Sequence, residues 1–255
     1  WGAPTYYAHA MNRYMHEFGV TKKDFAEIAV VAREWATLNP KAVMHSKETH
    51  PFGGPIDLET VLSSRPIAWP LNLLDCCLVT DHGGAVVIVS KEQATEYKND
   101  PVWIEGSGEA ISHINMSQME DMTMTSAHLS SKRAYEIAGM GPKDMEMAML
   151  YDSFTYTAGV TAEMVGLAPR GEGTNLWKNG LASPKGKFPI NTNGGGLSYS
   201  HSGMYGMLLL VEAQRQLAGK ASGLEGRQTT AKSAIVNGTG GPLASTGTII
   251  LTVDR

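Results

Sequence analysis

The 255-residue sequence lacks most of the features that mark a membrane, nucleic-acid-binding or disulfide-bonded protein. No apolar run approaches the ~20 residues that a membrane-spanning helix needs. Lys and Arg number 21 against 25 Asp and Glu, so the net charge of -4 gives no basic surface for nucleic acid. The two cysteines, Cys76 and Cys77, are adjacent and poorly placed for a disulfide. We therefore expect a cytoplasmic protein.

The composition is that of an ordinary globular protein. Hydrophobic residues make up 42% and charged residues 18%, and the length is sufficient for one large or two smaller domains. The chain begins at Trp1 without an initiator Met or a signal pattern, so we expect a processed or truncated start. His45 and His50 have no matching Cys or carboxylate cluster, and no metal site is predicted.

Periodicity and breakers in the first half predict two helices, over residues 4–18 and from Thr21 to about Leu38. Residues 41–70 are predicted to be irregular because prolines and glycines interrupt them. Two short apolar runs, 74–80 and 85–90, flank a turn at 81–84 and predict a pair of buried strands. Residues 101–125 are ambiguous, with a strand before a Met-rich loop as one interpretation.

The second half alternates more regularly. It predicts a helix over 126–138, a strand over 145–150 and a helix around 157–165, then a Gly/Asn/Lys-rich excursion over 169–187. Two further strands are predicted at 233–237 and 246–253. This order predicts an α/β fold with functional residues at strand ends.

The stretch from residue 189 to 219 carries the strongest chemical signal. It is an Asn/Gly-rich loop that leads to His201 and then to an amphipathic helix, from Met204 to a cap at Gly219. Glycines without Cβ atoms allow the backbone to approach a ligand closely. An imidazole at a helix N-terminus, beside free N–H groups, predicts chemistry at a carbonyl oxygen.

This loop resembles the Asn-x-x-Gly-Gly…Gly-His-Pro-x-Gly-x-x-Gly…Gln-Leu-x-Gly segment of thiolases, in the sterol-carrier and lipid-transfer branch. The triplet here reads Ser200-His201-Ser202, so the His is retained in a changed context. The resemblance implies a layered αβαβα fold. Residues 1–65 would form the loop domain on the acyl-coenzyme A side, 66–125 the end of the N-terminal half, and 126–255 the C-terminal half. The family's nucleophilic cysteine would precede Trp1.

The resemblance also implies catalytic residues. His201 would donate an N–H to the thioester oxygen. Tyr151 occupies the first position of the Asn-Glu-Ala-Phe or His-Asp-Cys-Phe motif of the family, and Ser153 stands where one branch has its acid/base cysteine. The tyrosine resembles retro-aldolases of steroid side-chain breakdown, although a residue at this position can also simply cap a buried strand. Serine does not shuttle protons near neutral pH as a tuned thiol does.

Two loops would contact the substrate or the oxyanion. One contains Asn191, Gly194, Gly195 and Gly196, where structural turn roles are equally consistent with the sequence. The other contains Asn237, Gly238 and Gly240, where many thiolases carry Cys-x-Gly. Because it has no cysteine, we expect it to supply backbone geometry and polar contacts only.

The first functional hypothesis is a thiolase-like acyltransferase that makes or breaks a carbon–carbon bond in a coenzyme A thioester. It would use no bound cofactor and would take the acyl-CoA as substrate. The alternatives are a retro-aldolase that acts on a β-hydroxyacyl-CoA, or a non-catalytic subunit that supports an active partner. The resemblance implies a homodimer and a zinc-ribbon/OB-fold partner protein, with no nucleic acid or membrane.

Overall fold

The structure is a computed structural model that describes residues 2–253. Trp1, at the expected processed start, lies outside the described residues. Helices and strands alternate through the chain, with 3-10 turns between them. The α-helices are α1 (Ala3–Phe18), α2 (Lys22–Thr37), α3 (Leu58–Ser63), α4 (Lys91–Ala94), α5 (Ala127–Ala138), α6 (Thr155–Met164), α7 (Asn175–Lys178) and α8 (Gly206–Leu217).

The main sheet has four strands in the order β3-β6-β5-β4. Strands β3 and β6 pair antiparallel, as do β6 and β5, whereas β5 and β4 run parallel. A separate small ribbon joins β1 to β2. The strands are β1 (Pro66–Ala68), β2 (Leu71–Asn72), β3 (Trp103–Ile111), β4 (Met147–Leu150), β5 (Ser233–Gly240) and β6 (Ser245–Thr252).

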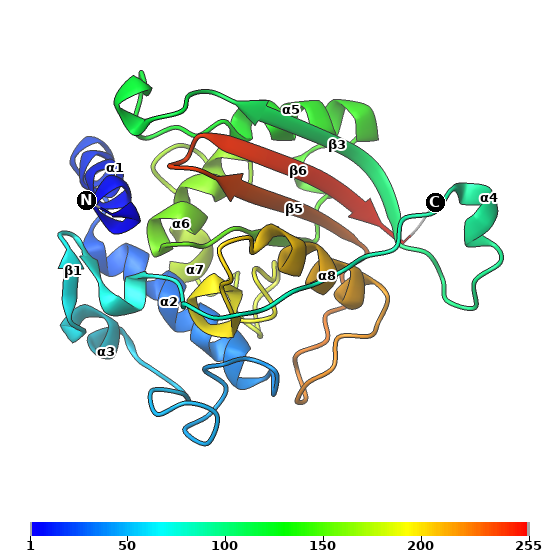
Figure 1. Cartoon of the computed structure of the whole chain (residues 1–255), viewed down its shortest axis with the longest axis horizontal. Helices are drawn as coiled ribbons and strands as arrows, with labels where there is room; N and C mark the ends of the chain where they lie inside the picture. The colour runs from blue at the N-terminus through cyan, green and yellow to red at the C-terminus, as the bar shows by residue number, and fades with distance from the viewer. Residues whose placement is uncertain (1, 254–255) are drawn as a thin grey trace.

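Helices cover the two faces of this sheet, as Figure 1 shows for α5 and α8. Helix α5 lies directly on β3 because β3 has glycines where the two approach. A Cβ atom on Gly106 would lie 2.1 Å from the Ala134 carbonyl oxygen, and one on Gly108 would lie 2.2 Å from that of Ser130. Successive residues of a strand face opposite sides, so Ile235 belongs to the core cluster shared with α5 and Val236 to the cluster with α8.

The N-terminal helices pack against α6. Tyr14 of α1 meets Phe25 of α2 and Tyr156 of α6, with ring centroids 5.6 and 5.8 Å apart. Buried Glu163 of α6 accepts hydrogen bonds from the Tyr14 hydroxyl and from the Gly173 N–H. These contacts fix the position of α6, which begins just after the strand-end residue Tyr151.

Most element predictions are confirmed. Helices α1, α2, α5, α6 and α8 and strands β4 to β6 match the predicted segments within a few residues. Strand β3 lies in the region 101–125, which the sequence left ambiguous. The N-terminal signal of α2 is a capping box between Thr21 and Asp24, and Gly219 adopts φ 67° after α8. The prediction that 41–70 is irregular missed α3, whose N-cap Asp57 accepts a hydrogen bond from the Thr60 N–H.

The predicted strands at 74–80 and 85–90 are wrong. Residues Leu73–Asp75 form a 3-10 turn and residues 77–90 have no regular secondary structure. In Figure 1 the segment crosses the molecule in front of α8 before it reaches α4. Backbone N–H groups of Cys77, Leu78 and Thr80 bond to loop carbonyls instead of to a strand. Within residues 2–253 no strand pairs with this run, so its apolar pattern does not produce a sheet.

Candidate active site

Tyr151 and His201 meet although fifty positions separate them in the sequence. Tyr151 follows β4, and His201 follows η4 (Gly195–Tyr199), a π-helical turn. The Tyr151 hydroxyl oxygen lies 2.9 Å from His201 Nε2, and the rings cross edge-on with centroids 5.4 Å apart. The structure therefore brings together the two residues on which the predicted chemistry depends.

Both residues line a cavity of about 820 Å³. Its walls come from α1, from the segment that follows β3, from the start of α6 and from the turn between β5 and β6. The side chains are mixed, with aromatic and Met residues opposite the Tyr151–His201 pair. The lining includes Tyr6, Tyr7, Cys77, Met116, Met122, Ser153, Phe154, Thr239, Gly240 and Pro242.

Burial sets the protonation of the pair. Desolvation lowers the pKa of His201, and it raises the pKa of Tyr151 far above the usual phenol value. Near neutral pH the imidazole and the phenol are both uncharged. One group donates the hydrogen bond between them and the other accepts it, according to the imidazole tautomer.

Ser153 lines the cavity and is buried, but the Tyr151–His201 hydrogen bond does not include it. The Ser153 hydroxyl lies 3.1 Å from the Thr157 hydroxyl one turn along α6. Its backbone carbonyl accepts a hydrogen bond from the Cys77 N–H. These contacts hold Ser153 at the cavity wall. Its catalytic role stays a prediction.

The glycine loop faces protein atoms. The amide of Asn191 exchanges two hydrogen bonds of 2.8 Å with the backbone of Leu150, so it anchors the loop to the end of β4. A Cβ atom on Gly194 would lie 2.8 Å from that of Ala36, and one on Gly195 would lie 2.0 Å from Asp152 Oδ2. The Cβ sides of Gly194 and Gly195 face α2 and Asp152, and contact of the loop backbone with a ligand stays a prediction.

The helix after His201 also differs from the expectation. Helix α8 begins only at Gly206, and Met204, expected on its apolar face, is 84% exposed ahead of the helix. The His201 ring instead stacks on Tyr205, with centroids 6.0 Å apart. Its backbone N–H donates to the Thr80 hydroxyl. The imidazole is thus positioned by neighbouring rings and loops instead of by the first turn of a helix.

The second predicted loop divides into a buried part and a cavity part. Asn237 is fully buried and donates from its amide to the Thr248 hydroxyl, and Gly238 packs against Gly206. Gly240 lines the cavity as predicted for a substrate loop residue, and so does its neighbour Thr239. The sequence pattern gave no signal for Thr239 because it fell at the unspecified position of the motif.

Sequence reasoning also missed Asp152, Tyr7 and Tyr205. Asp152 is fully buried and accepts hydrogen bonds from the N–H groups of the glycine loop. The Tyr7 hydroxyl donates to the Gly241 carbonyl at the cavity wall. Only Asp152 carried a usable signal, since it lies between Tyr151 and Ser153 at a strand end, where buried carboxylates need partners.

The cysteines do not behave as activated thiols. Both are half-buried, and Cys77 reaches the cavity wall. Burial raises the pKa of each thiol to about 12. No group of three or more His, Cys, Asp and Glu side chains suited to a metal ion occurs within residues 2–253. None of the helices described over this range is long and apolar enough to cross a membrane.

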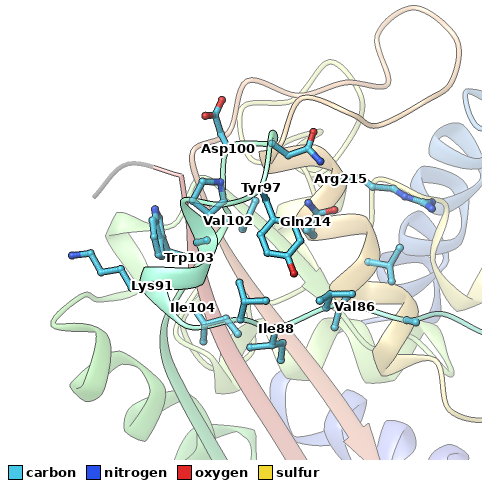
Figure 2. Close-up of a pocket in the computed structure, with 17 residues that line it drawn as sticks. Val86, Ile88, Lys91, Tyr97, Asp100, Val102, Trp103, Ile104, Gln214 and Arg215 are labelled. Atoms are coloured by element: carbon cyan, nitrogen blue, oxygen red, sulfur yellow. The ribbon is translucent and has the colours of Figure 1, made fainter.

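A second cavity of about 580 Å³ lies between the segment 85–104 and α8. Figure 2 shows Tyr97 between Ile88 and Gln214, with Trp103 and Lys91 at one side. None of the predicted site residues lines it. The chemistry-bearing residues therefore gather in the first cavity.

Comparison with known proteins shows to which family the chain belongs. Residues 108–253 match the family described as Thiolase C-terminal domain-like. The chain belongs to this family. The glycine-loop motif predicted it, and the fold is a thiolase-like mixed α/β fold.

Relatives with two kinds of activity are similar to the chain. It is 35% identical over 95% of its length to a steroid side-chain-cleaving aldolase of Thermomonospora curvata, of which it covers 60%. It is 30% identical over 94% of its length to an acetyl-CoA acetyltransferase of Methanothermobacter thermautotrophicus, of which it covers 62%. The solved Ltp2-ChsH2(DUF35) aldolase superposes on the whole chain with a TM-score of 0.85 and 30% identity, and the chain covers 64% of it. The chain thus spans about 60% of the length of these relatives.

Proposed function

We propose that the protein cleaves a carbon–carbon bond of a β-hydroxyacyl-coenzyme A by a retro-aldol reaction. The observation that carries the proposal is the 2.9 Å hydrogen bond between the Tyr151 hydroxyl and His201 Nε2 at the wall of a large cavity. The similarity to two aldolases supports the same reaction class.

The pair has the chemistry that the reaction needs. Tyr151 takes the proton of the substrate β-hydroxyl while its own proton passes to neutral His201. The Cα–Cβ bond then breaks, the hydroxyl carbon leaves as a carbonyl, and the electron pair forms the thioester enolate. Proton return to Cα gives the shortened acyl-CoA. Neither an oxidant nor a reductant is required, and the imidazolium formed in the first step stabilises the enolate oxygen.

The pKa shifts fix the protonation states from which the relay starts. Burial keeps the phenol protonated, so Tyr151 acts as a relay and not as a free phenolate. Burial keeps the imidazole neutral, which leaves one ring nitrogen as an acceptor, and its lowered pKa makes His201 a weaker base than a free imidazole. The two groups therefore start in the protonation states that the relay uses.

Acyl transfer of the thiolase type is the second candidate. The similarity to an acetyl-CoA acetyltransferase favours it, and Cys77 offers a thiol at the cavity wall. That mechanism requires a thiolate nucleophile. Burial raises the pKa of Cys76 and of Cys77 to about 12, which opposes thiolate formation at these two positions. We rank the retro-aldol reaction first because the Tyr151–His201 hydrogen bond offers the proton relay that this reaction uses.

The test compares two substrates in the same protein. A β-hydroxyacyl-CoA is incubated without free coenzyme A, and a β-ketoacyl-CoA is incubated with it, and the products are followed by mass spectrometry. We expect cleavage of the first to a carbonyl compound and a shorter acyl-CoA. Cleavage of the second alone would replace the proposal with acyl transfer, and turnover of neither would favour a non-catalytic subunit.

Variants assign the roles. We expect Tyr151→Phe to lower kcat by about 10²–10⁴ and His201→Ala by about 10²–10³. Tyr135→Phe is the matched control, because that buried hydroxyl donates to the Val165 carbonyl and Tyr135 does not line the cavity. If Tyr151→Phe reduces the rate less than tenfold, Tyr151 has a packing role only.

We also propose that the protein works with a separate partner subunit. The support is the similarity to the solved aldolase, which is described as a complex with ChsH2(DUF35). The expected homodimer stays a prediction. Light scattering of the purified protein, with and without an added DUF35 protein, tests both expectations. A mass for the chain alone in the mixture would contradict the partner.

A further inference from the structure

Asp152 is a buried carboxylate to which the proposed reaction gives no role. It follows Tyr151 directly, yet its side chain is fully buried and does not line the cavity. Oδ1 accepts the Gly196 N–H at 2.7 Å and Oδ2 accepts the Leu197 N–H at 3.4 Å. Two backbone groups of η4 therefore depend on one carboxylate, which lies 44 positions away in the sequence.

The His201 ring lies against the same glycine. A Cβ atom added to Gly196 would lie 3.0 Å from His201 Cδ2 and 3.2 Å from Asp152 Oδ1. The Cβ position of Gly196 is thus within contact distance of both the carboxylate and the imidazole. Any side chain at this position would separate the ring from the backbone on which it rests.

The imidazole also lies beside the Tyr205 ring, with centroids 6.0 Å apart. The two rings stack at an interplanar angle of 28°, and the Tyr205 hydroxyl donates to Asn193 Oδ1 at 2.9 Å. The same amide oxygen accepts the Gly195 N–H. The ring therefore has two neighbours, Gly196 and Tyr205, and each of them is tied to the beginning of η4.

We infer that Asp152 is a positioning residue, which fixes η4 and, through Gly196, holds the His201 ring in hydrogen-bond contact with the Tyr151 hydroxyl. One dipeptide, Tyr151-Asp152, then supplies both the phenol that meets Nε2 and the carboxylate that binds the backbone of Gly196 beside the ring. The inference extends the proposed function, because it names what keeps the relay aligned.

Position matters to such a relay because a misplacement of about 1 Å can cost a factor of about 10² in rate. Without the carboxylate, the N–H groups of Gly196 and Leu197 are buried without an acceptor, so η4 is expected to move toward other partners. An Asn side chain keeps one acceptor oxygen and restores one of the two bonds.

The experiment uses Asp152→Ala and Asp152→Asn with two readouts. The first is the ring ¹⁵N–¹H NMR signal of His201, assigned by its loss in His201→Ala, which reports the Nε2 hydrogen bond without any turnover. The second is kcat and KM for β-hydroxyacyl-CoA cleavage. We expect a shifted His201 signal in both variants. The expected fall in kcat is about 100-fold for Ala and about 10-fold for Asn, with KM changed less than threefold.

Glu163→Gln is the matched control. Glu163 is a buried carboxylate that also accepts a backbone N–H, from Gly173, but its partners lie on α1 and beside α6. We expect this variant to lose stability while the His201 signal and kcat stay as in the wild type. An equal fall in kcat for Glu163→Gln would mean that any buried carboxylate has this effect, and would overturn the inference.

The two proposals fail in different ways. An unshifted His201 signal in Asp152→Asn overturns the positioning role, whatever the activity of that variant. If Asp152→Ala does not fold, the result for Asp152→Asn decides the question by itself. A shifted signal in a protein that cleaves no β-hydroxyacyl-CoA supports the positioning role and removes the proposed reaction.

Discussion

The segment after β4 and the segment after Cys77 are both apolar in sequence, yet they occupy opposite environments. Residues 151–165 are buried throughout, whereas residues 81–90 are exposed or half-buried, with Val87 83% and Ile88 70% exposed. The first segment follows a strand that has a parallel neighbour in β5 and a bridge to Ile190. The second pairs with no strand within residues 2–253. An apolar run forms a β-strand only where another strand lies beside it and pairs with its backbone.

The cavity at Tyr151 and His201 and the cavity beside residues 85–104 also differ. The one beside β4 contains the Tyr151–His201 hydrogen bond, with a buried carboxylate behind it. The one beside residues 85–104 has mainly aliphatic and aromatic walls, with polar groups such as Lys91, Asp100 and Arg215 among them (Figure 2). Chemistry thus coincides with the more deeply buried of the two regions. The following substitutions compare the two regions directly.

Glycine substitutions in the two regions are expected to differ most in their effect on the free energy of unfolding. Gly195 has φ 68°, and an added Cβ would lie 2.0 Å from Asp152 Oδ2, so Gly195→Ala combines backbone strain with a steric clash against a buried group. We expect a loss of more than about 4 kcal/mol in the free energy of unfolding. Gly83→Ala, with open space around its Cβ position, is expected to change it by less than about 0.5 kcal/mol. Urea denaturation of the two variants measures both, and similar midpoints would contradict the described environment of η4.

Isoleucine truncation tests the exposed run itself. Ile235 in β5 is fully buried, and Ile235→Ala is expected to cost about 3 kcal/mol through lost burial and the cavity left behind. Ile88→Ala removes the same atoms from a 70% exposed side chain and is expected to cost less than about 0.5 kcal/mol. Urea denaturation provides the comparison. An Ile88→Ala cost near that of Ile235→Ala would mean that the run is covered in solution.

Local sequence signals explain which parts of the fold and of the site were predictable from the sequence. Helix α2 was predictable because Thr21 and Asp24 form its N-terminal cap. Strands β5 and β6 were predictable because each finds its pairing partner in this chain, where the two pair with each other. Tyr151 and His201 were predictable from motifs. The sequence signal for Asp152 was limited to its place at a strand end. Its partners Gly196 and Leu197 are distant in sequence, so the need for its carboxylate becomes visible only when η4 folds onto it.

The burial of Asp152 also makes stability depend on pH, which is the smallest effect expected. Desolvation raises its pKa to about 7 from an ordinary value near 3.8, although the N–H groups of Gly196 and Leu197 oppose the shift. The native state therefore binds this proton more tightly than the unfolded state. Its contribution to stability is complete below about pH 4 and is lost as the pH rises to about 7. The lowered pKa of His201 acts in the opposite direction, because the neutral ring is favoured in the fold and stability is lost as the pH falls.

Comparison with Asp152→Asn isolates the carboxylate, since the variant keeps His201 and removes only the titrating group at residue 152. We expect the thermal midpoint of the wild type to fall by at least about 3 °C relative to that of the variant between pH 5 and pH 7.5. Calorimetry at several pH values measures the difference, and Ile88→Ala, which removes no titrating group, should run parallel to the wild type. If the curves of wild type and Asp152→Asn are also parallel, the carboxylate titrates as it does in the unfolded chain. The buried region beside β4 would then be as accessible to water as the run that follows Cys77.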